Sequence, residues 1–85
     1  MVVHARAAIG ANCLIGQNTT IGGRSGHYPV PKIGNNVEIC AGSRVLGPIT
    51  VGDNAIIGAN AVVIHDVPAN AVVAGVPAKI IKMRT

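Results

Sequence analysis

Aromatic residues are almost absent from this chain of 85 residues, which contains no Phe, no Trp and a single Tyr, Tyr28. An interior built around large rings is therefore excluded, and any core must be assembled from Ile, Val and Ala. The shortage also argues against a surface for single-stranded nucleic acid, because such surfaces stack bases on aromatic side chains. A chain of this length forms one domain at most and buries too little surface to be comfortably stable alone.

Acidic residues are also scarce. Three Asp and Glu oppose seven Lys and Arg, which gives a formal net charge of +4 at pH 7. The C-terminal end carries a cluster of three cations, Lys79, Lys82 and Arg84. Clustered positive charge favours a ligand that bears phosphate; the alternative is a tail that only improves solubility.

Long unbroken apolar runs and paired cysteines are missing as well. No stretch is long enough to span a bilayer, and nothing resembles a signal peptide. Cys13 and Cys40 do not form a C-x-x-C pair, so we expect both to be reduced packing residues. These features together predict a cytoplasmic protein.

The sequence does contain a period of six residues. Each hexad begins with a branched aliphatic residue. In most hexads Gly or Asn follows this residue within three positions, and a small or apolar residue comes four positions after it. Six is a multiple of the strand period of two but not of 3.6, so each hexad predicts a short strand and a turn. Gly and Asn suit these turns because they adopt positive φ at low cost. Hexapeptide repetition is typical of a parallel β-helix. We expect the following residues to point inward: Val3, Ile9, Ile15, Ile21, Ile33, Ile39, Val45, Val51, Ile57 and Val63.

One segment, GGRSGHYPVPK at residues 22–32, interrupts the repeat. It spans two hexads with no aliphatic residue in phase between them, and its glycines and prolines predict a loop that protrudes from a corner.

The sequence thus predicts a single β-helix domain over residues 1–85 with about four coils. Pro68 and Pro77 cannot donate to a strand ladder, so the regular sheet should fray there. Residues 76–82 then form either a last strand or one helical turn. The predicted parts are a first coil at 1–21, the loop at 22–32, regular coils at 33–67 and a C-terminal tail at 68–85.

Two segments, IGNNVEICAGSRVLGPITVGDNAIIGANAVV and DVPANAVVAGVPAKII, resemble the hexapeptide-repeat acetyltransferases, and most closely their serine O-acetyltransferase branch. The resemblance covers nearly the whole chain. It implies an all-β fold, a left-handed parallel β-helix in which three hexads make one triangular coil. It also implies a homotrimer that acts as an acetyl-CoA-dependent O-acetyltransferase on a small hydroxyl acceptor, either serine or a sugar.

The resemblance further implies a coenzyme site. In the family, acetyl-CoA lies in a groove between neighbouring subunits, where backbone groups at the coil corners hold its pantetheine arm and basic residues meet its phosphates. An alternative explanation for small residues at these corners is crowding alone. The positions that correspond to coenzyme contacts are Ala41 and Ala59 at the corners, Ile64 and His65 in place of a Thr-Lys pair, and Lys79 and Lys82 for phosphate.

Acyl transfer to a hydroxyl needs a general base beside the acceptor oxygen, and an imidazole suits this task. In the serine acetyltransferases the base belongs to a D-H-x-x-G-[IV]-V-[IV] motif, whose Asp and His would precede the first residue of this sequence. His27 in the loop and His4 in the first coil are the substitutes. Arg24 and Tyr28 flank His27 and are candidates to hold the acceptor.

Two other functions remain as alternatives. The γ-type carbonic anhydrases share the fold but need three His around Zn²⁺. This chain has three His in all, without that family's local motif, so no metal is expected. The second alternative is a non-catalytic trimeric β-helix scaffold that still binds coenzyme A, which the absent His-Asp motif favours.

Overall fold

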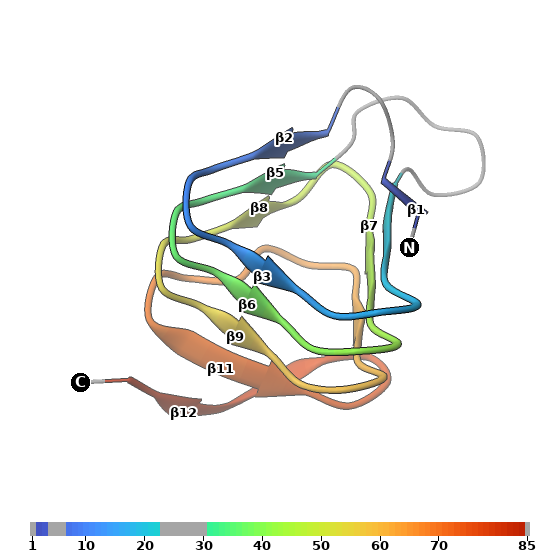
Figure 1. Ribbon diagram of the computed structural model, residues 1–85. Helices are drawn as coiled ribbons and strands as arrows, with labels where there is room; N and C mark the ends of the chain where they lie inside the picture. The colour runs from blue at the N-terminus through green and yellow to red at the C-terminus, as the bar shows by residue number, and fades with distance from the viewer. Residues whose placement is uncertain (1, 4–6, 23–30, 85) are drawn as a thin grey trace.

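The computed structural model describes residues 2–3, 7–22 and 31–84, and all regular structure in these residues is β-strand. The strands form three sheets that enclose a triangular prism (Figure 1). Sheet A contains β1 (Val2–Val3), β4 (Thr20–Gly22), β7 (Arg44–Leu46) and β10 (Val62–Val63). Sheet B contains β2 (Ala8–Ile9), β5 (Lys32–Ile33) and β8 (Thr50–Val51). Sheet C contains β3 (Leu14–Ile15), β6 (Glu38–Ile39), β9 (Ile56–Ile57), β11 (Ala71–Ala74) and β12 (Lys79–Met83).

Neighbouring strands within a sheet are parallel and one coil apart, with the exception of the last pair. Lys32 pairs with Thr50, which lies eighteen residues further along the chain, so three hexads make one coil as predicted. Thr20 pairs with Arg44, and this coil is therefore one hexad longer. The extra hexad falls between β4 and β5, where the interruption lies. Gly22 ends β4 and Lys32 begins β5, so the two ends of the predicted loop belong to strands.

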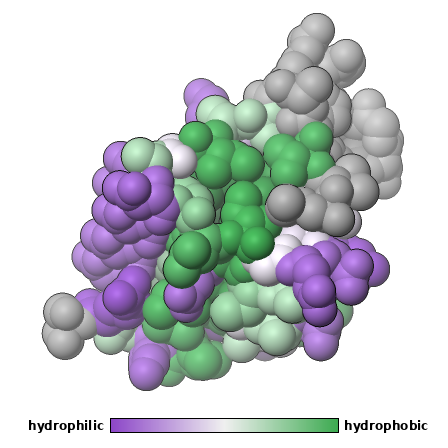
Figure 2. All heavy atoms as spheres, viewed as in Figure 1, coloured by the Kyte–Doolittle hydropathy of each residue, from purple (hydrophilic) through white to green (hydrophobic). Residues whose placement is uncertain are grey.

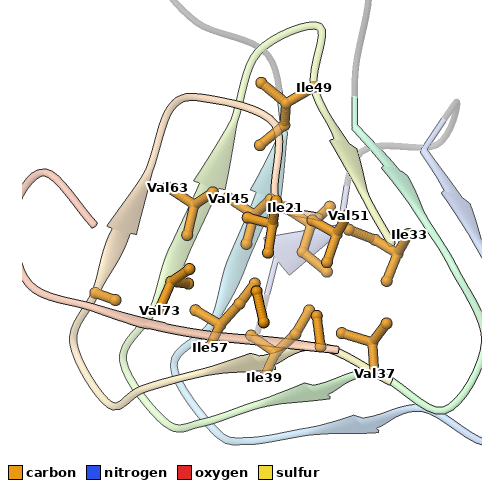
Figure 3. Packing of buried hydrophobic residues seen from close by; sticks show 14 residues of the cluster. Ile21, Ile33, Val37, Ile39, Val45, Ile49, Val51, Ile57, Val63 and Val73 are labelled. Atoms are coloured by element: carbon orange, nitrogen blue, oxygen red, sulfur yellow. The ribbon is translucent and has the colours of Figure 1, made fainter. Parts of the chain in front are cut away.

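The predicted inward positions form the core of the prism (Figure 3). Those from Ile21 to Val63 are at most 5% exposed. Ile9 and Ile15 of the first coil are partly buried and pack against this core. Val3 pairs with Ile21 in the expected register, but it is 39% exposed because β1 is the edge strand of sheet A. On the side of the molecule seen in Figure 1, hydrophobic residues gather in the middle, between hydrophilic residues on either side (Figure 2).

In the described part of the chain two polar residues, Thr19 and Ser43, are buried, and both are paired. The Thr19 hydroxyl donates to the Gly16 carbonyl at 2.8 Å. The Ser43 Oγ lies 2.7 Å from the Cys40 carbonyl oxygen and 2.8 Å from that of Gly58, in the next coil. Among the described residues no buried side-chain nitrogen or oxygen lacks a hydrogen-bond partner. The Ser43 hydroxyl therefore links successive coils without the cost of an unpaired buried group.

The C-terminal end of the prism departs from the parallel repeat. Sheet B ends in a single bridge between Val51 and Val67, directly before Pro68. The chain then forms β11, turns, and returns as β12, which pairs antiparallel with β11. Residues 79–83 are therefore a strand, which decides between the two predicted alternatives. The part of the chain described here includes no helix long and apolar enough to cross a membrane.

Candidate functional site

The corners of the prism are four-residue turns, and at two of the three corners the third residue has positive φ. The B–C corner, between sheets B and C, comprises residues 10–13, 34–37, 52–55 and 68–71, and its third residue is Asn in every coil, with φ between 58° and 65°. The C–A corner comprises residues 16–19, 40–43 and 58–61, with Asn18, Gly42 and Asn60 at this position. The A–B corner comprises residues 46–49 and 64–67 in the described coils. The predicted role of Asn and Gly in the turns is confirmed.

At two steps of the B–C corner, a side chain caps an amide of the preceding coil. The Oδ1 atom of Asn35 accepts a hydrogen bond from the Ala11 amide at 2.8 Å. One coil later, Asp53 Oδ1 accepts from the Asn35 amide at 2.7 Å. Arg84 donates from its guanidinium to the Asn54 carbonyl at 2.8 Å on the same corner. A polar residue at the second turn position therefore satisfies a donor that the short strands leave unpaired.

The C–A corner lacks these caps. Its second turn positions are Gln17, Ala41 and Ala59, which are stacked in register: the Gly42 amide donates to the Gln17 carbonyl at 2.9 Å, and the Asn60 amide donates to the Ala41 carbonyl at 3.0 Å. The methyl groups of Ala41 and Ala59 cannot accept a hydrogen bond. The amides of all three stacked residues make no hydrogen bond to any residue that the structure describes.

This corner therefore presents a row of unpaired N–H groups on exposed residues. A Cβ added to Gly16 would lie 2.5 Å from the Ala41 amide nitrogen, so the close approach of these two turns requires glycine at position 16. Such a row fits a ligand that carries amide or ester carbonyl oxygens. The sequence predicted Ala41 and Ala59 but missed Gln17, although Gln17 holds the same turn position one coil earlier.

The two predicted phosphate-binding residues, Lys79 and Lys82, lie on β12 next to this corner. Lys79 pairs with Ala74, and Ala74 is packed against Gly58 of the corner. Lys82 pairs with Val72, and a β-bulge lies between the two pairs. Val72 and Ala74 lie two residues apart on β11, so the lysines share one face of the sheet. Both side chains are exposed.

Ile64 and His65 are placed elsewhere, at the A–B corner. The structure brings Ala41 and Ala59 together, but it separates them from His65 by the width of sheet A within one chain. Asp66 of this corner accepts a hydrogen bond from the Thr50 amide at 2.9 Å, so it serves the turn, as Asp53 does in the B–C corner.

The remaining predicted site residues cannot be placed. The candidate bases His4 and His27 and the acceptor-binding candidates Arg24 and Tyr28 lie outside the described residues. Within residues 2–3, 7–22 and 31–84, no group of three or more His, Cys, Asp or Glu could hold a metal ion. Cys13 and Cys40 are both free thiols and half-buried.

Comparison with known proteins agrees with this architecture. Residues 31–65 match the family described as bacterial transferase hexapeptide (six repeats), and residues 6–47 match the hexapeptide repeat of succinyl-transferase. The chain is 43% identical over 84 residues to a serine acetyltransferase of Synechococcus elongatus, covering 95% of this chain and 34% of that protein.

Solved structures give the same result. A serine acetyltransferase from Brucella abortus superimposes with a TM-score of 0.94 at 42% identity, covering 100% of this chain and 35% of that one. A galactoside acetyltransferase in complex with coenzyme A superimposes with a TM-score of 0.85 at 34% identity, covering 98% of this chain and 48% of that one. The fold is therefore the left-handed parallel β-helix that the repeat and the resemblance predict.

Together the two family matches cover residues 6–65, so the chain belongs to the hexapeptide-repeat family, and it is similar to serine acetyltransferases. It spans about a third of the length of the curated relatives that it matches.

Proposed function

We propose that this chain binds acetyl-CoA at the C–A corner and transfers the acetyl group to the hydroxyl of a small acceptor, serine or a sugar. The observation that carries the proposal is the row of unpaired amides at Gln17, Ala41 and Ala59. The pantetheine arm of coenzyme A contains two amide groups in an extended chain, so its carbonyl oxygens can accept from such a row. The small residues at positions 41 and 59 leave room for this approach.

The charges near this corner support the same ligand. Lys79 and Lys82 share one face of β12 and are close to the last coil of the corner. Two exposed ammonium groups on one face suit the phosphates of coenzyme A, which remain in solvent while the pantetheine arm follows the corner. The coenzyme thus lies with its phosphates toward the C-terminal end of the prism and its thioester toward the first coil.

The transfer itself requires a general base. As the acceptor oxygen attacks the thioester carbonyl, the base takes the hydroxyl proton, the C–S bond breaks and the thiolate of coenzyme A leaves. His27 is the first candidate and His4 the second, with Arg24 and Tyr28 holding the acceptor beside His27. Ile64 and His65 reach the coenzyme only from another subunit, because they lie across sheet A from the corner. A homotrimer, in which the A–B corner of one prism faces the C–A corner of the next, meets this requirement.

The proposed setting is the cytoplasm, where the two free thiols Cys13 and Cys40 stay reduced. The second candidate function is a non-catalytic trimeric scaffold that binds coenzyme A. One observation favours it: His65, the one histidine among the described residues, is exposed and stands at a corner away from the amide row.

The test follows thiol release from acetyl-CoA over serine, galactosides and amino sugars. Wild type, His27→Ala and His4→Ala are compared, with His65→Ala as the control for loss of an exposed imidazole. The enzyme proposal predicts turnover with one acceptor class and a loss of roughly 10²–10⁴-fold for the variant that lacks the base. Coenzyme binding without turnover above background hydrolysis for any acceptor would contradict the enzyme and support the scaffold.

A further inference from the structure

The strand β12 has a free edge. It is the last strand of sheet C, with β11 on one side and no further strand among the described residues on the other (Figure 1). The backbone groups of β12 that face away from β11 make no hydrogen bond within the described part of the chain. Free edges of this kind are templates for the addition of another strand.

The side chains of this strand are unusually apolar for an exposed edge. Six large hydrophobic residues are exposed among the described residues, and four of them lie between Val76 and Met83. Ile80 and Met83 are both 52% exposed, and they pair with Val73 and Ala71, which belong to the core. They therefore lie on the face of sheet C that continues the prism interior. Soluble proteins usually protect such an edge, so its exposure indicates an interaction surface.

The opposite face of the same strand is basic. Lys79 and Lys82 both lie there, because the β-bulge restores them to one side. A second copy of the chain fits this surface poorly: antiparallel pairing of two β12 strands would place four lysines on one sheet face, and like charges on neighbouring strands are destabilising. A strand with carboxylates opposite the lysines has the complementary charge.

We propose that β12 is a docking site for an extended acidic peptide segment of a partner protein, which adds to sheet C as a further strand. The segment alternates Asp or Glu, facing Lys79 and Lys82, with aliphatic residues, facing Ile80 and Met83. Main-chain hydrogen bonds give the affinity, and the two faces of β12 give the selectivity, as in other cases of strand addition.

The experiment measures fluorescence anisotropy of labelled synthetic peptides against the whole protein, without coenzyme A, so that this proposal and the coenzyme proposal can fail separately. The probes are an alternating Glu-Val octapeptide, a Lys-Val octapeptide of the same length, and the Glu-Val peptide with alternate backbone nitrogens methylated. The protein variants are Lys79→Glu with Lys82→Glu, and Lys32→Glu with Arg44→Glu as a charge-matched control on the other sheets.

We expect the Glu-Val peptide to bind wild type and the control, the methylated peptide to lose binding, and the Lys79→Glu, Lys82→Glu variant to bind about tenfold more weakly. The same variant should gain affinity for the Lys-Val peptide. Equal binding of the methylated peptide would show attraction by charge alone and overturn strand addition. Hydrogen-exchange protection of β12 that rises with protein concentration, with no peptide present, would assign the edge to a second copy and also overturn the proposal.

Discussion

Lys79 and Lys82 lie on the same face of β12 although three residues separate them in sequence. In a regular strand, residues three apart point to opposite faces. Here Lys79 pairs with Ala74 and Lys82 with Val72, and the bulge between the two pairs accommodates the extra residue. The bulge thus converts two dispersed cations into one basic surface beside the C–A corner.

This surface leads to a prediction about coenzyme phosphates. Lys79→Glu combined with Lys82→Glu should weaken coenzyme A far more than dephospho-coenzyme A, because only the former carries the additional phosphate. Isothermal titration calorimetry of both ligands measures the difference, and Lys32→Glu, an exposed charge reversal on sheet B, is the control. An equal loss for the two ligands would show that the lysines do not contact that phosphate.

The row of inward-pointing aliphatic residues gives a prediction about stability. Ile57→Asp should lower the free energy of unfolding by about 4 kcal/mol or more, because Ile57 is fully buried and an unpaired carboxylate would replace it. Ile56→Asp is the matched control, since Ile56 is the preceding residue of β9 and faces outward, half-buried. Chemical denaturation of both variants is the measurement. A similar, small effect for the two would contradict the packing.

Assembly gives a third prediction. The small size of the domain and the separation of His65 from the amide row both favour a homotrimer. Sedimentation equilibrium should give a mass three times that of the 8.6 kDa chain. A species at the mass of one chain would refute the trimer and leave Ile64 and His65 without access to a coenzyme at the C–A corner.

The repeat made most of the fold predictable, since every described aliphatic residue in phase with the repeat from Ile21 to Val63 is buried. Val3 has the correct phase but is exposed, because phase determines the direction of a side chain and not whether a neighbouring coil covers it. Similarly, the strand at Lys79–Met83 could not be chosen from sequence, as its pairing partner β11 lies in the irregular segment after Pro68.

The site was less predictable than the fold. Ala41 and Ala59 were identified by resemblance, and the structure adds a difference between the two corners. Asn35 and Asp53 accept hydrogen bonds from the coil before, and Ala41 and Ala59 cannot. A sequence shows which residue follows each strand, but not which backbone amides remain unpaired once the coils are stacked. Gln17 was missed for this reason.

The most direct test of the account supplies the missing cap at the C–A corner. Ala59→Asn places an asparagine at the turn position that Asn35 holds in the B–C corner, where Asn35 caps the Ala11 amide. The new side chain should accept a hydrogen bond from the Ala41 amide, which is then no longer available to the coenzyme. Ala69→Asn is the matched control, because Ala69 holds the equivalent turn position at the B–C corner. Calorimetric titration with coenzyme A should show about a tenfold loss of affinity for Ala59→Asn, the value of one lost hydrogen bond, with the Ala69→Asn variant unchanged. Unchanged affinity in both folded variants would contradict the claim that the unpaired amides of the C–A corner hold the coenzyme.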